Sequence, residues 1–380
     1  MAATETKTSA PTSPEEAAEL LASGGPRVIR GGGTKSGWGN PLEAEPAVLS
    51  TAAMNRIHEH AEGDFTVVLD AGVPFAEAQE TFAKAGQMLG LDPPEVDGAT
   101  VGGVFSAAES GPLRHRYGAP RDLVIGVTLA LAGGTVAKAG GKVIKNVAGY
   151  DISKLVAGAH GTLGVICRLS LRLHPKPAST ATAVLRAGDP AELARRAIEL
   201  GGKPLECDAL DARWDHDRGE GSLLLRFSGE TCQARAEALG FELASEADDE
   251  RLWAEQRQRQ RAESSDGIVV RVAGVPTALG DVIAAAAQHG GSVVSRAGVG
   301  TSYIRLPAAD TTAAGIDAVA ALRAALRPAR CTVTDAPAPI RAGLDPWDVP
   351  EGAELELMRS VKRRFDPERR LNPGIYVGGI

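Results

Sequence analysis

Apolar residues alternate with polar ones in several short runs of the N-terminal half, and this period of two is typical of β-strands. The clearest run is FTVVLDAG at 65–72, and PRVIRGGG at 26–33 and AVLST at 47–51 have the same character. By contrast, PFAEAQETFAKAG at 74–86 carries its apolar residues at helical spacing. Two further strands are predicted within 121–140, joined by a Gly-Gly pair that suits a hairpin turn. Strands that alternate with helices indicate an α/β arrangement in this part of the chain.

The C-terminal half shows the same two periods in a different order. Runs between 267 and 335 predict the order strand, helix, strand, strand, helix, strand, which is that of a ferredoxin-like split unit. The stretch 181–240 repeats most of this order, with its last strand unclear. We therefore predict that two related half-units form one largely antiparallel sheet covered by helices.

Composition changes at HPKPAST (174–180), where two prolines end a strand. We predict a first domain at 15–177 and a cap domain at 178–340. Residues 1–14 are small and polar with two prolines, which predicts a disordered N-terminus. The polar, Pro-containing segment 341–380 should return over the first domain.

Charge and cysteine content exclude several classes of protein. The net charge of -7 is the wrong sign for a general nucleic-acid surface, so no nucleic-acid partner is expected. The 4 cysteines are scattered without a CxxC pair, which predicts no metal or iron–sulfur site and reduced, buried thiols. No apolar run is long enough for a transmembrane segment and no signal peptide is visible, so we expect a cytoplasmic protein, with membrane association through partner subunits left open.

Three glycine-rich segments carry the candidate chemistry. RGGGTKSGWG at 30–39 follows a strand, and its consecutive glycines leave backbone N–H groups open to an anion. In DGATVGGVFSAAESG at 97–111, two glycines open a helix whose N-terminus could face phosphate, although close packing of small residues explains this segment equally well. The third segment, at 145–166, places GTLG before an apolar strand. Three such segments at strand or helix ends predict one extended ligand, whereas a ligand-free glycine hairpin remains the alternative for the first taken alone.

The order GGGTKSG, ATVGG, KNVAGYDISKL with HGTLGVI, and a terminal LNPG resembles a known FAD-binding family. This family includes vanillyl-alcohol oxidase, p-cresol methylhydroxylase and D-lactate dehydrogenase-type enzymes. The phrase GGKVIKNVAGYDISKL resembles most closely the smaller FAD-binding subunit of bacterial glycolate oxidases. The resemblance implies an α+β fold, with a two-subdomain FAD-binding domain of the vanillyl-alcohol oxidase type and a ferredoxin-like antiparallel cap.

The resemblance also implies which residues bind FAD. The first segment would hold the pyrophosphate, the second would lie along pyrophosphate and flavin, the third would line the adenosine or flavin side, and the terminal segment would approach the isoalloxazine. The implied residues are Gly31, Gly32, Gly33, Thr34, Lys35, Ser36, Gly37, Thr100, Gly102, Gly103, Ser106, Gly161, Thr162, Gly164, Val165 and Asn372, with Arg369 as a further candidate.

Two departures from the family pattern matter. Some relatives attach FAD covalently through a His after the glycines, but this chain has Thr34 there, so we expect noncovalent FAD. Catalytic relatives carry an HxGDGNxH-type motif in the cap, whereas this cap contains only His216 and His289 in other contexts. No catalytic base is therefore assigned and no metal site is expected.

Other polar residues are candidate contacts of the flavin or the substrate. Lys142 and Lys145 could place positive charge near the flavin. The basic cluster of Arg114, Arg116 and Arg121 could receive a carboxylate substrate or an acidic patch of a partner, but a solvated loop is the favoured interpretation, as it is for His115. His160, beside GTLG, is the histidine expected nearest the cofactor.

These observations favour an FAD-dependent oxidoreductase that is one subunit of a 2-hydroxy-acid (glycolate) oxidase complex. Its implied partners are a sister flavoprotein subunit and an iron–sulfur subunit that removes electrons. The alternatives are a self-sufficient FAD enzyme acting on a hydroxy acid or alcohol, and a non-catalytic assembly subunit.

Overall fold

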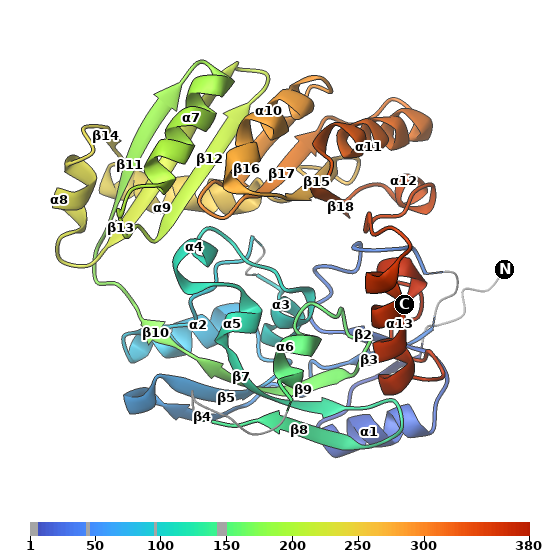
Figure 1. Ribbon diagram of the computed structural model, residues 1–380. Helices are drawn as coiled ribbons and strands as arrows, with labels where there is room; N and C mark the ends of the chain where they lie inside the picture. Colours follow the sequence, from blue (N-terminus) through green and yellow to red (C-terminus); the bar gives the residue numbers. More distant parts are fainter. Residues whose placement is uncertain (1–6, 43–45, 95–96, 143–149) are drawn as a thin grey trace.

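The structure is a computed structural model that describes residues 7–42, 46–94, 97–142 and 150–380. It consists of an N-terminal domain, a cap domain above it, and a C-terminal helix beside the N-terminal domain (Figure 1).

Two sheets form the N-terminal domain. A parallel sheet has the order β1-β3-β2 and an antiparallel sheet has the order β4-β5-β9-β7-β8. Their strands are β1 (Thr8–Ser9), β2 (Arg27–Arg30), β3 (Ala47–Ser50), β4 (Ile57–Ala61), β5 (Thr66–Asp70), β7 (Val124–Ala130), β8 (Val136–Gly140) and β9 (Val165–Arg172); β6 (Gln87–Met88) pairs with β10 (His174–Pro175). The predicted strands at 26–33, 47–51 and 65–72 and the Gly-Gly hairpin are confirmed.

Helices cover both sheets. The helices are α1 (Pro14–Ala22), α2 (Phe75–Lys84), α3 (Val101–Ala107), α4 (Arg114–Tyr117), α5 (Pro120–Leu123) and α6 (Ile152–Val156). Phe75 and Phe82 of α2 and Phe105 of α3 are almost fully buried against the inner face of the antiparallel sheet, within the largest core of this domain. Helix α2 follows the helical pattern that its sequence predicts.

The predicted disorder at 1–14 is wrong for residues 7–14, and residues 1–6 lie outside the described residues. Thr8 and Ser9 pair in parallel with Val48 and Leu49 of β3. Ser13 then caps α1, because its hydroxyl accepts a hydrogen bond from the backbone N–H of Glu16 (3.1 Å). The composition of this segment does not reveal either element, because the strand depends on a distant partner and the helix cap depends on a single serine.

The cap is one antiparallel sheet of the order β14-β11-β13-β12-β16-β17-β15-β18. Its strands are β11 (Thr180–Ala187), β12 (Ala209–Asp215), β13 (Glu220–Ser228), β14 (Glu242–Leu243), β15 (Ile268–Ala273), β16 (Ser292–Arg296), β17 (Thr301–Leu306) and β18 (Arg330–Asp335). Its helices are α7 (Pro190–Gly201), α8 (Cys232–Glu237), α9 (Glu246–Gln258), α10 (Leu279–Ala287) and α11 (Thr312–Leu326). Each half runs strand, helix, strand, strand, helix, strand, as predicted, and the two halves join where β12 pairs with β16. The strand that was unclear in the sequence, β14, has only 2 residues.

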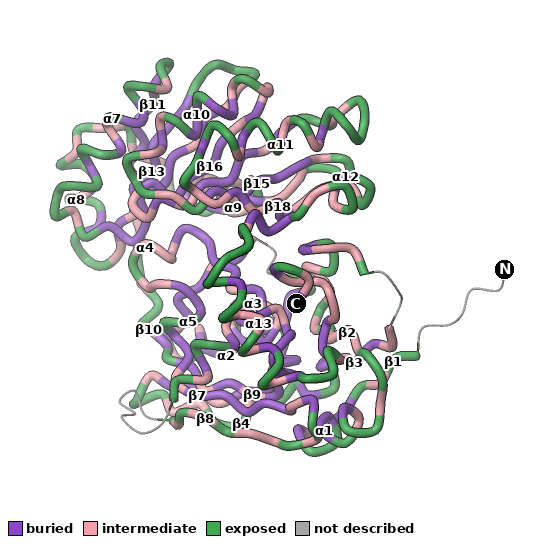
Figure 2. Tube along the Cα trace, turned by 45° about the vertical axis from the view of Figure 1, so that its right-hand side comes forward, coloured by how far each residue is buried: buried purple, intermediate pink, exposed green. Residues whose placement is uncertain are grey.

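The two faces of the cap sheet differ in chemistry. Alternate residues such as Val270, Val272 and Ile304 pack in the apolar core beneath α7, α10 and α11. The opposite face packs in part against Trp253 of α9 and is otherwise turned toward the N-terminal domain. It carries polar side chains, among them Asp211 and Arg296, which form a buried ion pair (2.7 Å). Figure 2 shows buried positions running along the strands of both domains while the outer helices keep exposed residues. The period of two thus gives the cap sheet one face for its main core and one shared by α9 and the neighbouring domain.

The C-terminal segment lies against the N-terminal domain. After α12 (Ala338–Ala342) comes helix α13 (Ala353–Phe365), whose Val361 and Phe365 pack against the larger core of the N-terminal domain, and the short helix η3 (Val377–Gly379) follows near the C-terminus (Figure 1). Leu371 is fully buried in the small core around α1 and bridges to Arg27 of β2.

Candidate functional site

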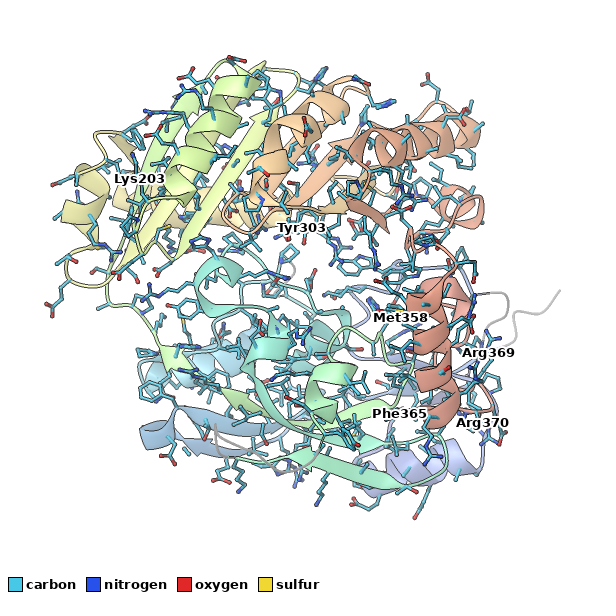
Figure 3. The ribbon with its side chains drawn as sticks, viewed as in Figure 1. Lys203, Tyr303, Met358, Phe365, Arg369 and Arg370 are labelled. Carbon is cyan, nitrogen blue, oxygen red and sulfur yellow. The ribbon has the colours of Figure 1, made fainter. Side chains whose placement is uncertain are left out.

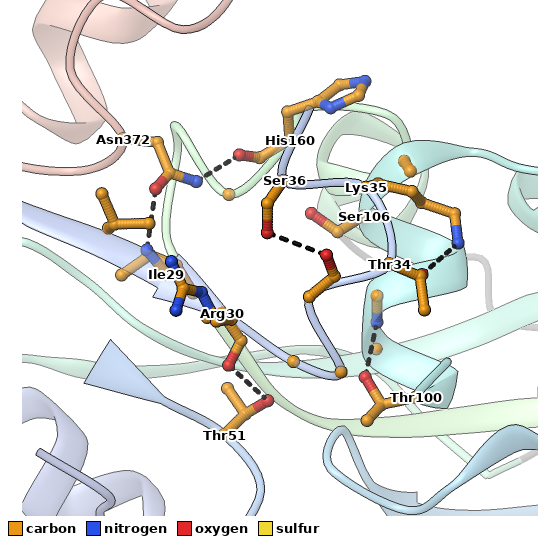
Figure 4. A pocket seen from close by; sticks show the side chains of 18 of the residues that line it. Ile29, Arg30, Thr34, Lys35, Ser36, Thr51, Thr100, Ser106, His160 and Asn372 are labelled. Atoms are coloured by element: carbon orange, nitrogen blue, oxygen red, sulfur yellow. Dashed lines mark hydrogen bonds between the residues drawn. The ribbon is translucent and has the colours of Figure 1, made fainter. Parts of the chain in front are cut away.

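A cavity lies between the two sheets of the N-terminal domain, where the three glycine-rich segments meet (Figure 4). Most of the residues predicted to bind FAD line it: Gly31, Gly32, Gly33, Thr34, Lys35, Ser36, Thr100, Gly102, Gly103, Ser106, Gly161 and Asn372. Residues that the sequence analysis did not select complete the wall: Val28, Ile29, Arg30, Leu42, Thr51, Ala71, Ala99, Ala107, Ile166 and Ile375. Several of these residues belong to, or directly adjoin, a predicted strand or glycine-rich segment, and this position in the sequence could have identified them.

The loop after β2 supplies backbone donors. The N–H groups of residues 32–35 donate no hydrogen bond to any part of the chain that the structure describes. Gly33 has φ +79, and Ser36 closes the turn by donating both its backbone N–H (3.1 Å) and its hydroxyl (2.8 Å) to the Gly33 carbonyl. A run of free N–H groups lining a cavity is an anion-binding nest.

The close fit of this loop explains why it needs glycine. A Cβ added to Gly32 would lie 1.6 Å from the carbonyl oxygen of Gly98. The loop is therefore pressed against the second glycine-rich segment, and any side chain at Gly32 would separate the two.

Helix α3 does not bind an anion through its N-terminus in the way the sequence suggested. The N–H groups of Val101 and Gly102 donate to the carbonyls of Val73 (2.9 Å) and Ala71 (2.8 Å), and that of Gly103 donates to the Thr100 hydroxyl (3.2 Å). These donors are already used, so they are not available to phosphate. Instead the helix lines the cavity with small residues. Both interpretations of the sequence therefore apply in part, because the helix borders the cavity as predicted and its small residues also allow close packing.

The third segment, at 145–166, lines the cavity through His160, Gly161 and Ile166. Gly161 lines it, whereas Thr162, Gly164 and Val165 do not, and Gly37 also lies outside the lining. Thr162 and Val165 are buried, and the Thr162 hydroxyl donates to the Ala159 carbonyl (2.7 Å). The placement of these residues makes them a support for the cavity wall.

Asn372 joins three segments at one end of the cavity (Figure 4). Its side-chain NH₂ donates to the His160 carbonyl (2.6 Å), its side-chain oxygen accepts from the N–H of Ile29 (2.7 Å), and its own N–H donates to the Arg27 carbonyl (2.9 Å). Arg369 does not line this cavity; it donates to the carbonyl of Gly379 on the far side of the terminal segment (Figure 3).

His160, the histidine expected nearest the cofactor, lies in the cavity wall. Its ring contacts an aromatic group formed by Trp38, Trp347 and Tyr376, with centroid distances of 6.3, 4.9 and 5.2 Å. Burial, with smaller contributions from Arg271 and Lys35, lowers the pKa of His160 to about 3. The imidazole is therefore neutral at pH 7 and is too weakly basic in this state to accept a proton readily.

The other basic candidates are dispersed. Arg116 pairs with Asp208 of the cap (3.2 Å), and His115 Nε2 lies 3.6 Å from Cys207 Sγ, so a solvated loop is wrong for His115. Arg121 is exposed. Lys142 pairs with Glu59 and does not line the cavity. Lys145, with most of the KNVAGYD motif, lies outside the described residues.

The cysteines and possible metal ligands can now be placed. All 4 cysteines are free and buried, as predicted. Within the described ranges, no group of three or more His, Cys, Asp or Glu side chains is placed to hold a metal ion. No helix among the described residues is both long and apolar enough to span a membrane.

Two family matches include segments that line the cavity. Residues 8–140 match the family described as FAD binding domain, and residues 351–376 match FAD linked oxidases, C-terminal domain. The chain contains an FAD-binding domain. The matched regions contain the glycine loop, α3 and Asn372, and the nest and the small residues of α3 described above suit the diphosphate and the flat rings of FAD.

Curated relatives match less than half of the chain. They include the glycolate oxidase subunit GlcE of Escherichia coli (32% identical over 43% of this chain and 46% of the relative) and the glycolate oxidase subunit GlcD of Bacillus subtilis (34%, over 41% and 33%). A mitochondrial D-lactate dehydrogenase [cytochrome] of Arabidopsis thaliana is 34% identical over 46% of this chain and 31% of the relative. The matches thus span less than half the length of these relatives.

The fold itself is shared more widely. A solved structure of alkyldihydroxyacetonephosphate synthase aligns with a TM-score of 0.71, covering 96% of this chain and 76% of that chain at 16% identity. At this identity the likeness concerns the fold alone, and it includes the cap. The FAD-binding domain with an antiparallel cap is therefore confirmed as the fold class.

Proposed function

We propose that this chain is the FAD-binding subunit of a multi-subunit 2-hydroxy-acid oxidase or dehydrogenase, with glycolate as the candidate substrate. The observation that carries the proposal is the similarity to a glycolate oxidase subunit together with an FAD-binding match over most of the residues that line the cavity. Bound FAD would be the two-electron acceptor, and the chain's own residues would bind and orient it. The N–H groups of residues 32–35 would contact the diphosphate, α3 would lie along the cofactor, and Asn372 would lie at one end of the cavity.

A sister flavoprotein subunit and an iron–sulfur subunit are the partners we propose. Two observations support the proposal that substrate oxidation and electron removal depend on other subunits. The cap histidines His216 and His289 do not line the cavity, so they offer no base to a substrate near the flavin. The cysteines are buried singly, so cluster ligands would come from another chain. We place this complex in the cytoplasm or at a membrane surface to which its partners attach.

We expect the flavin to be noncovalent. Thr34, at the position where some relatives attach FAD through His, accepts a hydrogen bond from the Lys35 ammonium (2.9 Å) and offers no nucleophile comparable to imidazole. Precipitating the purified yellow protein with acid should release the FAD into the supernatant, where its absorbance is measured. A pellet that retains the flavin after washing would show a covalent bond and contradict the prediction.

We expect the isolated chain to oxidise glycolate and D-lactate at least about 10² to 10⁴ times more slowly than the complex, because loss of a general base costs about this factor. The measurement is anaerobic mixing of each acid with the FAD-loaded chain, and then with the co-expressed subunits, while flavin bleaching is followed. Equal bleaching rates in both experiments would support a self-sufficient enzyme instead. An absence of bleaching in the complex would support an assembly subunit.

A further inference from the structure

A second, smaller cavity lies between the FAD-binding domain and the cap, and we call it the interdomain cavity. It is lined by Trp38, Pro94, Ala108, Glu109, Ser110 and Arg114 of the FAD-binding domain and by Gln260, Arg261, Arg271, Ala273, Thr301 and Tyr303 of the cap. Tyr303 marks its roof in Figure 3, at the lower face of the cap sheet. The cavity adjoins the FAD cavity, because Lys35 of the FAD cavity pairs with Glu109 of the interdomain cavity (2.5 Å) and the Trp38 ring contacts His160. A ligand here would lie next to the cofactor.

Buried polar atoms of the interdomain cavity lack partners. Gln260 is 1% exposed, and neither its amide nitrogen nor its oxygen has a hydrogen-bond partner among the described residues. The same holds for Arg271 Nε and for Trp38 Nε1, which are also buried. Buried donors of this kind are almost always satisfied in folded proteins, so several of them around one cavity indicate a polar ligand or water.

The charge of the interdomain cavity is positive. Arg261 is held by Asp335 through two hydrogen bonds (2.8 and 2.9 Å), and Glu109 is held by Lys35. In contrast, no carboxylate within the described ranges forms a salt bridge with Arg114 or Arg271. Two guanidinium groups from opposite domains thus remain to be neutralised, and a planar guanidinium beside an amide matches the geometry of a carboxylate.

The sheet pattern explains why Arg271 reaches this place. On β15 the apolar residues Val270 and Val272 enter the cap core, so Arg271 between them points from the opposite face toward the FAD-binding domain. Its charge contributes to the lowered pKa of His160 and therefore acts across the domain boundary.

We propose that the interdomain cavity binds the carboxylate of a small organic acid, with Arg271 and Gln260 of the cap and Arg114 of the FAD-binding domain as its ligands. The volume of about 100 Å³ limits the ligand to a few heavy atoms. This inference rests on the proposed function, since it gives the substrate class a site, but binding can be tested without turnover. The bound carboxylate also neutralises Arg271 and thereby weakens one of the causes that keep His160 uncharged.

The test is calorimetric titration of the FAD-loaded chain with oxalate, a small dicarboxylate without an oxidisable hydroxyl. We expect saturable binding, and no binding of oxamide, which has the same shape without charge. Arg271→Met and Arg114→Met should each weaken oxalate binding about 10- to 100-fold, the range expected for hydrogen bonds to a charged group. The oxalate affinity of Arg271→Lys should lie between those of Arg271→Met and the wild type, because lysine keeps the charge but lacks the paired donors of the guanidinium.

Arg305→Met is the matched control. Arg305 lies on the neighbouring strand β17, pairs with Glu263 and does not line the interdomain cavity, so oxalate binding should stay unchanged. Because the two test arginines belong to different domains, misfolding of one variant, seen as a lowered melting temperature, leaves the other as the test.

The outcomes separate this proposal from the proposed function. Unchanged oxalate affinity in folded Arg271→Met and Arg114→Met would overturn the carboxylate site, as would equally tight binding of inorganic phosphate or of oxamide. Oxalate binding that needs both arginines would support the site even if glycolate never bleached the flavin, and that result would count against the proposed oxidation alone.

Discussion

Gly103→Val should weaken FAD binding by about 10- to 100-fold while leaving the chain folded. Gly103 lines the FAD cavity from α3, and a Cβ added there would meet only the Thr100 hydroxyl, at 3.1 Å. The rest of an isopropyl group would occupy space that the cofactor needs, and overfilling a site of this kind costs about 1–3 kcal/mol. Fluorescence quenching of free FAD by the apoprotein measures the dissociation constant.

The choice of position matters for this experiment. At Gly32 a side chain would collide with the Gly98 carbonyl, so loss of FAD there could reflect a displaced loop. Gly201→Val, at the exposed end of α7 in the cap, is the matched control and should bind FAD normally. A folded Gly103→Val protein with wild-type affinity would show that FAD does not lie along α3.

The second large effect is expected at Lys362 of α13, which is 3% exposed. Its ammonium donates to the carbonyls of Thr162 (2.8 Å) and Leu371 (2.9 Å) and to the carboxylate of Asp366 (2.7 Å). It thereby ties the C-terminal helix to the third glycine-rich segment and to the chain that precedes Asn372. Burial lowers the pKa of Lys362, and the hydrogen bond and charge of Asp366 oppose that effect.

Lys362→Met should reduce the free energy of unfolding by about 3–5 kcal/mol, because it leaves the fully buried Asp366 carboxylate without its cation. Chemical denaturation monitored by circular dichroism gives the value. Arg364→Met, on an exposed position of the same helix, should change stability little. The double variant Lys362→Met/Asp366→Asn should recover part of the loss, since it removes the uncompensated charge. A single variant as stable as the wild type would show that this ion pair does not hold the terminal segment.

The sequence by itself determined the elements and the class of ligand. Period-two runs predicted the strands of the cap, because one face of each strand must be apolar to enter the core beneath α7, α10 and α11. Glycine loops at strand ends predicted an extended anionic ligand, because free N–H groups are a property of the local backbone. The resemblance carried by these loops and by LNPG then pointed to FAD, which the family match confirms.

Only the tertiary structure decided what each donor and charge can do. The N-terminus of α3 looked open to phosphate in the sequence, yet carbonyls of Ala71 and Val73 occupy its donors. The N-terminal strand β1 exists because β3 pairs with it. Gln260 and Arg271 belong to no sequence motif. They become candidates because they line a cavity between two domains, where the Gln260 amide and Arg271 Nε have no hydrogen-bond partner in the described part of the chain. Hydrogen-bond satisfaction and charge pairing depend on residues far apart in the chain, so local pattern could not supply them.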